Sequence, residues 1–125
     1  MFLWALLLGV LKYAQIRESE QAAAHPYTDI AHRAALLYSF ALLLVAAFVE
    51  LSGWGTVINL IAAGAMTLYF YVAVGNYMTQ GIRRQTDNVF RDPVPGTHAF
   101  MISLIVAEIG GWIALLAGFL DGQIF

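Results

Sequence analysis

Four long apolar segments constrain this chain more than any other feature of its sequence. They cover residues 2–16, 34–51, 57–78 and 99–120. About twenty apolar residues in a helix cross the hydrocarbon core of a bilayer. The sequence therefore predicts an all-α integral membrane protein, a four-transmembrane-helix bundle that forms a single domain over residues 1–125.

Composition supports lipid as the solvent for most of the chain. Of its 125 residues, 61% are hydrophobic and 11% are charged, too few charges to cover so much apolar surface in water. The chain has no cysteine, which excludes disulfides, zinc thiolates and thiol nucleophiles. Six basic residues and a net charge of −2 exclude nucleic acid as a partner, because no basic patch can form.

The first apolar segment is the weakest of the four. It is short and contains Lys12. A signal peptide is the alternative, but the segment lacks a basic region before it, and residues 13–15 are a poor cleavage site. We expect a retained helix.

The basic residues predict the topology. All six flank or occupy the loops at residues 17–29 and 80–97, whereas the turn at residues 52–56 and both termini have none. Basic loops stay in the cytoplasm. These two loops are therefore expected to be cytoplasmic and both termini non-cytoplasmic.

The three histidines lie near the predicted cytoplasmic side. Because Pro26 disfavours a helix interior, we expect the second helix to begin near Ile30, with His32 in its first turn. His25 precedes Pro26 in a loop, where no rigid element is expected to hold its ring, and His98 follows a flexible segment. No pair has the spacing of a zinc site.

Small residues recur along the last two apolar segments and predict a homo-oligomer, because they let membrane helices approach closely. They are Gly64, Gly75, Gly110, Gly111 and Gly118. Glu108 lies near the middle of the last segment, and its carboxyl needs an interior position, a partner or a proton. It is either a proton carrier or ligand contact, or a structural hydrogen-bonding group.

The third segment carries a polar stripe that includes Tyr71, and Asn76 lies on an adjoining face. An amide in a membrane helix needs a partner, and a structural hydrogen bond is the simplest role for Asn76.

Two patterns in this sequence resemble those of the styrene oxide isomerases. The first is Ala31-His32-x-x-x-Leu36-Leu37-Tyr38, and the second is Tyr71-x-x-x-Gly75-Asn76-Tyr77 with Gly81 after it. The resemblance covers about residues 30–90. Those enzymes share a four-helix, usually trimeric architecture with the wider family of membrane-associated proteins in eicosanoid and glutathione metabolism. They hold haem b on a histidine in an Ala-His motif.

The resemblance implies that His32 binds the haem iron, and Arg33 is placed to meet a propionate. His32 and Asn76 match the isomerase pattern directly. The isomerase's asparagine on the second helix falls on Tyr38 here, its tyrosine aligns one place from Tyr71, and its acid has no counterpart.

The leading hypothesis from the resemblance is a trimeric, haem-dependent membrane isomerase that converts a small hydrophobic epoxide to a carbonyl compound. Ferric iron would act as a Lewis acid, while Tyr38, Tyr71 or Asn76 would orient the substrate. One alternative is a glutathione-dependent transferase whose thiol cofactor lies over Arg33, Arg83 and Arg84. The other is a non-catalytic subunit of a larger membrane complex.

Overall fold

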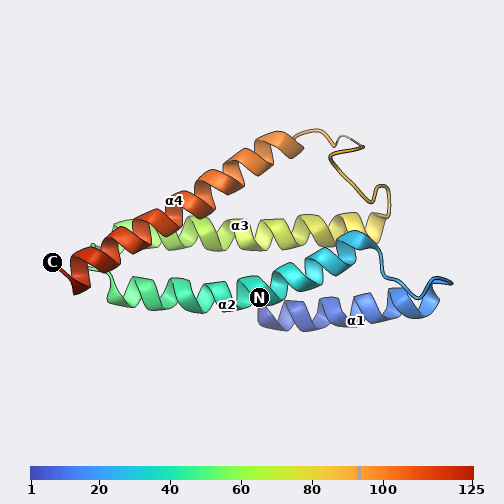
Figure 1. Cartoon of the computed structure of the whole chain (residues 1–125), viewed down its shortest axis with the longest axis horizontal. Coiled ribbons are helices and arrows are strands. Elements are labelled where there is room, and N and C mark those ends of the chain that lie inside the picture. Colours follow the sequence, from blue (N-terminus) through green and yellow to red (C-terminus); the bar gives the residue numbers. More distant parts are fainter. Residues whose placement is uncertain (93) are drawn as a thin grey trace. The chain divides into compact units, whose positions relative to one another are not determined.

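Four α-helices form the computed structural model, which describes residues 1–92 and 94–125 (Figure 1). In chain order they are α1 (Phe2–Glu18), α2 (Pro26–Leu51), α3 (Thr56–Arg83) and α4 (Thr97–Gln123). The described residues contain no β-strand. The all-helical architecture predicted from the apolar segments is confirmed.

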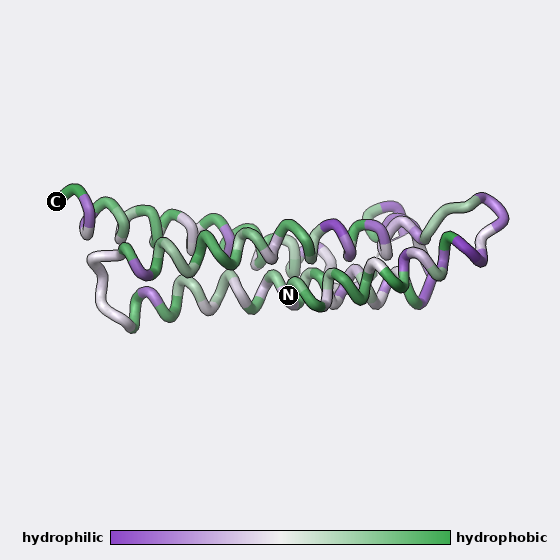
Figure 2. The backbone as a smooth tube through the Cα atoms, turned by 90° about the horizontal axis from the view of Figure 1, so that it is seen from below, coloured by the Kyte–Doolittle hydropathy of each residue, from purple (hydrophilic) through white to green (hydrophobic). Residues whose placement is uncertain are grey.

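Helices α2, α3 and α4 are each long and apolar enough to cross a membrane, so the protein is membrane-embedded. In Figure 2 the hydrophobic colour runs mainly along the helices, and hydrophilic residues gather near helix ends and in connections. Helix α1 has 17 residues. At 1.5 Å per residue it is about 25 Å long, shorter than the roughly 30 Å hydrocarbon core.

The helices extend beyond the predicted boundaries. Helix α2 begins at Pro26 rather than near Ile30, because proline fits the first helical position, where an N–H would have no helical acceptor anyway. His32 consequently lies in the second turn. Helix α3 continues to Arg83, so the connection to α4 is shorter than the predicted loop at residues 80–97.

The chain divides into two compact units. Unit 1 comprises residues 1–39 and 71–95, and unit 2 comprises residues 40–70 and 96–125. All six basic residues belong to unit 1: Lys12, Arg17, Arg33, Arg83, Arg84 and Arg91.

Small side chains form the core of unit 1. Ala5 and Leu8 of α1 pack with Ala31 and Ala35 of α2 and with Val74 of α3. All five are buried. Because alanine adds little bulk, three helix backbones approach closely here. Trp4 also stacks on Tyr71, with ring centroids 6.0 Å apart, which further fixes α1 against α3.

In unit 2, glycines fit the end of α4 against the tight α2–α3 turn. The N–H of Gly53 donates to the carbonyl oxygen of Gly118 at 2.8 Å. A Cβ atom on Gly118 would overlap Ser52, and one on Gly122 would overlap the Gly53 backbone. Of the other glycines expected at helix contacts, Gly75 faces Trp4 and Gly111 faces Met66 within the units, whereas Gly64 and Gly110 face open space.

Candidate functional site

His25 is held by hydrogen bonds of its side chain and its backbone, contrary to the expectation that it lies in an unfixed loop. It immediately precedes α2, and its Nδ1 atom accepts a hydrogen bond from the N–H of Tyr27 at 3.2 Å. Its carbonyl oxygen accepts bonds from the N–H groups of Thr28 and Asp29 at 2.9 and 3.1 Å. The imidazole therefore caps the helix N-terminus, as a short polar side chain usually does.

The side chain of Gln15, on α1, forms hydrogen bonds with both His25 and the end of α3. Its Oε1 atom accepts the N–H of His25 at 3.0 Å, and its Nε2 atom donates to the carbonyl oxygen of Gly81 at 3.2 Å. The side chain is buried, and both ends of its amide are used. Helix α2 also approaches α3 here, because a Cβ on Gly81 would overlap the backbone of Thr28.

Three aromatic rings continue from this cap into the unit. His25 stacks on Tyr27 with centroids 6.1 Å apart, and Tyr27 stacks on Tyr77 at 6.2 Å. The Tyr27 hydroxyl oxygen accepts the N–H of Val89 at 2.8 Å. Tyr27 thus connects the start of α2 to the loop that follows α3.

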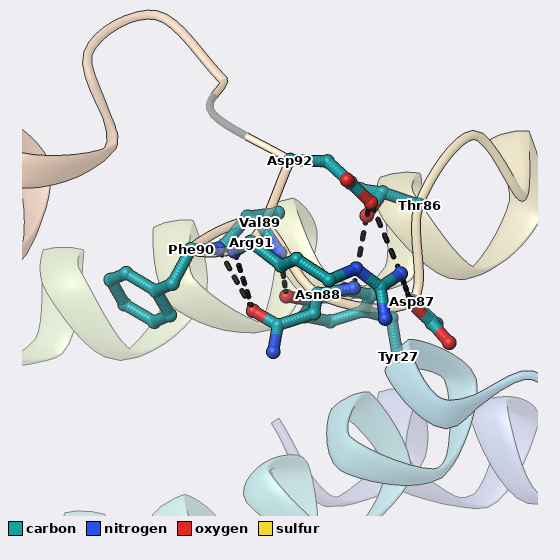
Figure 3. Close-up of polar contacts among 8 residues, drawn as sticks. All are labelled: Tyr27, Thr86, Asp87, Asn88, Val89, Phe90, Arg91 and Asp92. Atoms are coloured by element: carbon teal, nitrogen blue, oxygen red, sulfur yellow. Dashed lines mark hydrogen bonds and ion pairs between the residues drawn. The ribbon is translucent and has the colours of Figure 1, made fainter.

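That loop is held by its own side chains over residues 86–92 (Figure 3). Thr86 donates through its hydroxyl to Asp92 at 2.7 Å and accepts the N–H of Asn88 at 2.9 Å. Arg91 pairs with Asp87 and Asp92. The hydroxyl of Thr86 and the guanidinium of Arg91 hold the pKa of the Asp92 carboxyl below its usual value. The polar loop is ordered by an Asx and hydroxyl network of the kind that builds turns.

A polar pocket of about 280 Å³ opens beside His25. It is lined by Gln15, Glu18, Ser19, Gln21, Ala23, Ala24, His25 and Arg84. Ala22 and Arg84 both have a backbone φ of 52°. Such left-handed conformations cost energy in residues with a side chain and concentrate at functional sites.

The charges of the pocket are not neutralised by nearby side chains. Within residues 1–92 and 94–125, neither Arg84 nor Glu18 forms an ion pair or a side-chain hydrogen bond. Burial, helped by the nearby positive charge of Arg84, lowers the pKa of His25, and Asp87 partly opposes this shift. His25 is therefore neutral at pH 7.

No protein-family model, curated protein or solved structure matches this chain.

His32, the predicted haem ligand, lies between α1 and α2. A Cβ atom built on Gly9 would come within 3.2 Å of His32 Nε2, so the backbone of α1 covers that nitrogen. The Nδ1 atom is buried and has no hydrogen-bond partner among the described residues. An iron atom and a porphyrin need free space directly in front of the ligating nitrogen. In this packing α1 occupies the space in front of Nε2, so haem at His32 would require α1 to move.

Arg33 was predicted to meet a haem propionate, but its guanidinium points to Asp29. The two groups are 3.4 Å apart, and the Arg33 side chain is 71% exposed. Lys12 of α1 pairs with the same carboxylate at 2.5 Å. The charge that interrupts the first apolar segment is therefore compensated by an ion pair between helices.

The three predicted catalytic residues take different positions. Tyr38 packs against the core of unit 1. The Tyr71 hydroxyl oxygen accepts a hydrogen bond from the Met1 amino group at 2.8 Å, and Asn76 is exposed on α3. Five helical positions separate Tyr71 from Asn76, about 140° around the axis, so the two do not share a face.

Glu108 lies half-buried on α4, in unit 2. The same unit has an apolar groove of about 320 Å³ between α3 and α4. Its lining is aliphatic or small throughout: Ile58, Ile61, Ala62, Ala65, Val106, Ala107, Gly110, Gly111 and Ala114. Among the described residues, no group of three or more His, Asp or Glu side chains could hold a metal ion.

Sequence reasoning missed His25 and Gln15 as site residues. The available signal was the pair His25-Pro26, since a polar residue directly before a proline that opens a helix is an N-cap pattern. Nothing in the sequence indicated the role of Gln15, because its two partners are ten and 66 residues away.

Proposed function

We propose that this protein is a membrane-embedded transferase that joins the thiol of glutathione to a small hydrophobic electrophile. The observation that supports this function best is the pocket beside His25, where the unpaired guanidinium of Arg84 meets polar side chains. Its volume of about 280 Å³ suits the amino-acid end of a tripeptide such as glutathione. Arg84 was also one of the arginines at which this function was expected from the sequence.

The chemistry requires little from the protein beyond binding and charge. The thiolate sulfur forms a bond to an electrophilic carbon, the bond from that carbon to its leaving group breaks, and the thiol proton passes to water. A nearby positive charge favours the thiolate over the thiol. The guanidinium of Arg84 lines the pocket, where it binds an anionic group of glutathione and adds the positive charge that favours the thiolate. The bilayer around α2, α3 and α4 dissolves the hydrophobic electrophile.

The proposed topology places the pocket in the cytoplasm, where glutathione is abundant. All basic residues lie in unit 1, as does the pocket. We place the connections α1–α2 and α3–α4 in the cytoplasm and both termini on the other side. Gly64 and Gly110, which face open space, are suited to contacts in a homotrimer.

Epoxide isomerisation on haem stays a prediction from resemblance. The residues around His32 favour it less than the transferase, because the ring is covered on its Nε2 side by Gly9.

The test is a conjugation assay on the protein purified in mild detergent, with glutathione and 1-chloro-2,4-dinitrobenzene. Product formation above the uncatalysed rate is expected, with chloride released in equal amount. Arg84→Gln should reduce kcat/KM about tenfold or more, since a charge-assisted contact is lost. Arg17→Gln is the matched control, because Arg17 is exposed and does not line the pocket. Absence of product in the wild-type protein would refute the proposal.

A further inference from the structure

We infer that the pocket beside His25 recognises a zwitterionic group, that is, an oxyanion and an ammonium on one ligand. Arg84 and His25 bind the oxyanion, and Glu18 binds the ammonium. The inference rests on the proposed function, which assigns glutathione to the same pocket. It specifies which chemical group of the ligand the pocket binds.

His25 contributes a hydrogen-bond donor whose identity is fixed by the fold. Its Nδ1 atom accepts the N–H of Tyr27, so Nδ1 carries no proton. A neutral imidazole has one N–H, which must then be on Nε2. Stacking on Tyr27 holds the plane of the ring. His25 lines the pocket, so this N–H is the donor that its ring can offer to a ligand there.

Arg84 contributes the positive charge. Its guanidinium has no ion-pair partner among residues 1–92 and 94–125, so its N–H groups are available to a ligand. The N–H of Arg84 donates to the carbonyl oxygen of Gln80 at 3.0 Å, which fixes the backbone in its left-handed conformation. Guanidinium and imidazole N–H groups together match the acceptor oxygens of a carboxylate or a phosphate.

Glu18 sets the other half of the specificity. It lines the same pocket, and it has no cationic partner among the described residues. A ligand with only negative charge would be repelled by this carboxylate, while a ligand with an adjacent ammonium would be attracted. The remaining polar side chains of the lining are uncharged: Gln15, Ser19 and Gln21. One acid and one base favour a ligand group without net charge.

Two sources supply this chemistry. The amino-acid end of glutathione carries a carboxylate and an ammonium, and the headgroup of phosphatidylethanolamine carries a phosphate and an ammonium. The experiment therefore measures binding of each, without relying on transfer chemistry.

Binding of S-methylglutathione, which has no thiol to react, is measured by calorimetry on the full chain in detergent. Arg84→Gln and Glu18→Gln should each weaken binding about tenfold or more. Arg17→Gln and Glu20→Gln are the controls, since both residues are exposed neighbours outside the lining; they should leave the affinity unchanged. Inorganic phosphate, an anion without an ammonium, should bind much more weakly than S-methylglutathione.

His25 is tested with two amides of different length. Asn at position 25 places an acceptor where Nδ1 lies, keeping the helix cap, but removes the donor at Nε2. Gln places a donor near Nε2 and loses the cap. His25→Asn should fold and bind weakly, whereas His25→Gln should be less stable but bind better than His25→Asn.

Competition identifies the source of the ligand. Displacement of S-methylglutathione by bicelles with phosphatidylethanolamine, but not by bicelles with phosphatidylglycerol, identifies the lipid; no displacement by either identifies the soluble molecule. Unchanged affinity in both Arg84→Gln and Glu18→Gln, or phosphate binding as tight as S-methylglutathione, would overturn the inference. A protein that binds S-methylglutathione as expected but forms no conjugate would refute the transferase and leave the zwitterion site standing.

Discussion

Gln15 of α1 donates to the carbonyl oxygen of Gly81 near the end of α3, across 66 residues of sequence. The same side chain accepts the N–H of His25, so one buried amide joins α1, α3 and the cap of α2. The pocket of unit 1 depends on this junction, because Gln15 and His25 both line it.

Replacing Gln15 by leucine should lower the free energy of unfolding by about 2–5 kcal/mol, because the carbonyl oxygen of Gly81, which is buried, and the N–H of His25, which is partly buried, lose their partner. Unfolding in mixed micelles, followed by circular dichroism, measures the change. Gln21→Leu is the control, since Gln21 is exposed and on the rim of the same pocket. Equal stability of the two variants would contradict the junction.

Gly81→Ala should destabilise unit 1 by roughly 1–3 kcal/mol, because the new methyl group would overlap the backbone of Thr28, which is fully buried. Gly64→Ala is the comparison within the same helix. A Cβ there meets nothing within 4 Å, so the monomer should be as stable as the wild type. Thermal unfolding in detergent distinguishes the two.

His25 should titrate below the ordinary value of 6.5, since burial and the charge of Arg84 lower its pKa. The unfolded chain then binds more protons than the folded one between the two pKa values, so stability rises with pH there. The contribution of His25 is complete above about pH 6.5 and is lost as pH falls through the folded pKa. NMR of the imidazole protons gives the pKa directly. A pKa above 6.5 would show that burial and the charge of Arg84 do not lower the pKa of the His25 ring.

Haem supplied during expression should not bind through His32, because Gly9 covers Nε2 and Nδ1 is buried. Wild-type protein and His32→Ala should therefore give the same absorption spectrum, without a Soret band that depends on His32. A wild-type Soret band that disappears in His32→Ala would show that α1 moves aside, and it would restore the haem isomerase as the leading function.

Reporter fusions test the proposed topology. Fusions near Glu20 and Asp87 should report the cytoplasm, and fusions at Trp54 and at either terminus should report the opposite side. The expectation follows from the six basic residues of unit 1. A cytoplasmic reporter at the N-terminus, with the other four sites as expected, would show that α1 does not cross the membrane, as its length of 17 residues allows.

The apolar segments by themselves determined the helical, membrane-embedded architecture. Backbone groups in the hydrocarbon core have no water to bond, and a continuous apolar segment of this length satisfies them as a helix. Composition also placed the tight turn after α2, where Ser52 and Gly53 interrupt the apolar run. Helix ends were less predictable. Pro26 was read as a residue outside the helix, but the ring is equally compatible with the first helical position, and only the cap formed by His25 decides between them.

The tertiary structure alone decided the site. The sequence favours His32 over His25 as a ligand, because His32 is expected on a helix and His25 in a loop. Whether a ring nitrogen is accessible depends instead on the neighbour in front of it. Gly9 closes the approach to His32, whereas a hydrogen bond from Tyr27 orients His25 beside an open pocket. Gly9 lies against His32 because α1 packs on α2, and Tyr27 binds His25 because of the backbone geometry at the start of α2. The periodicity of one segment predicts which residues share a helix face, but it does not predict which helix covers that face.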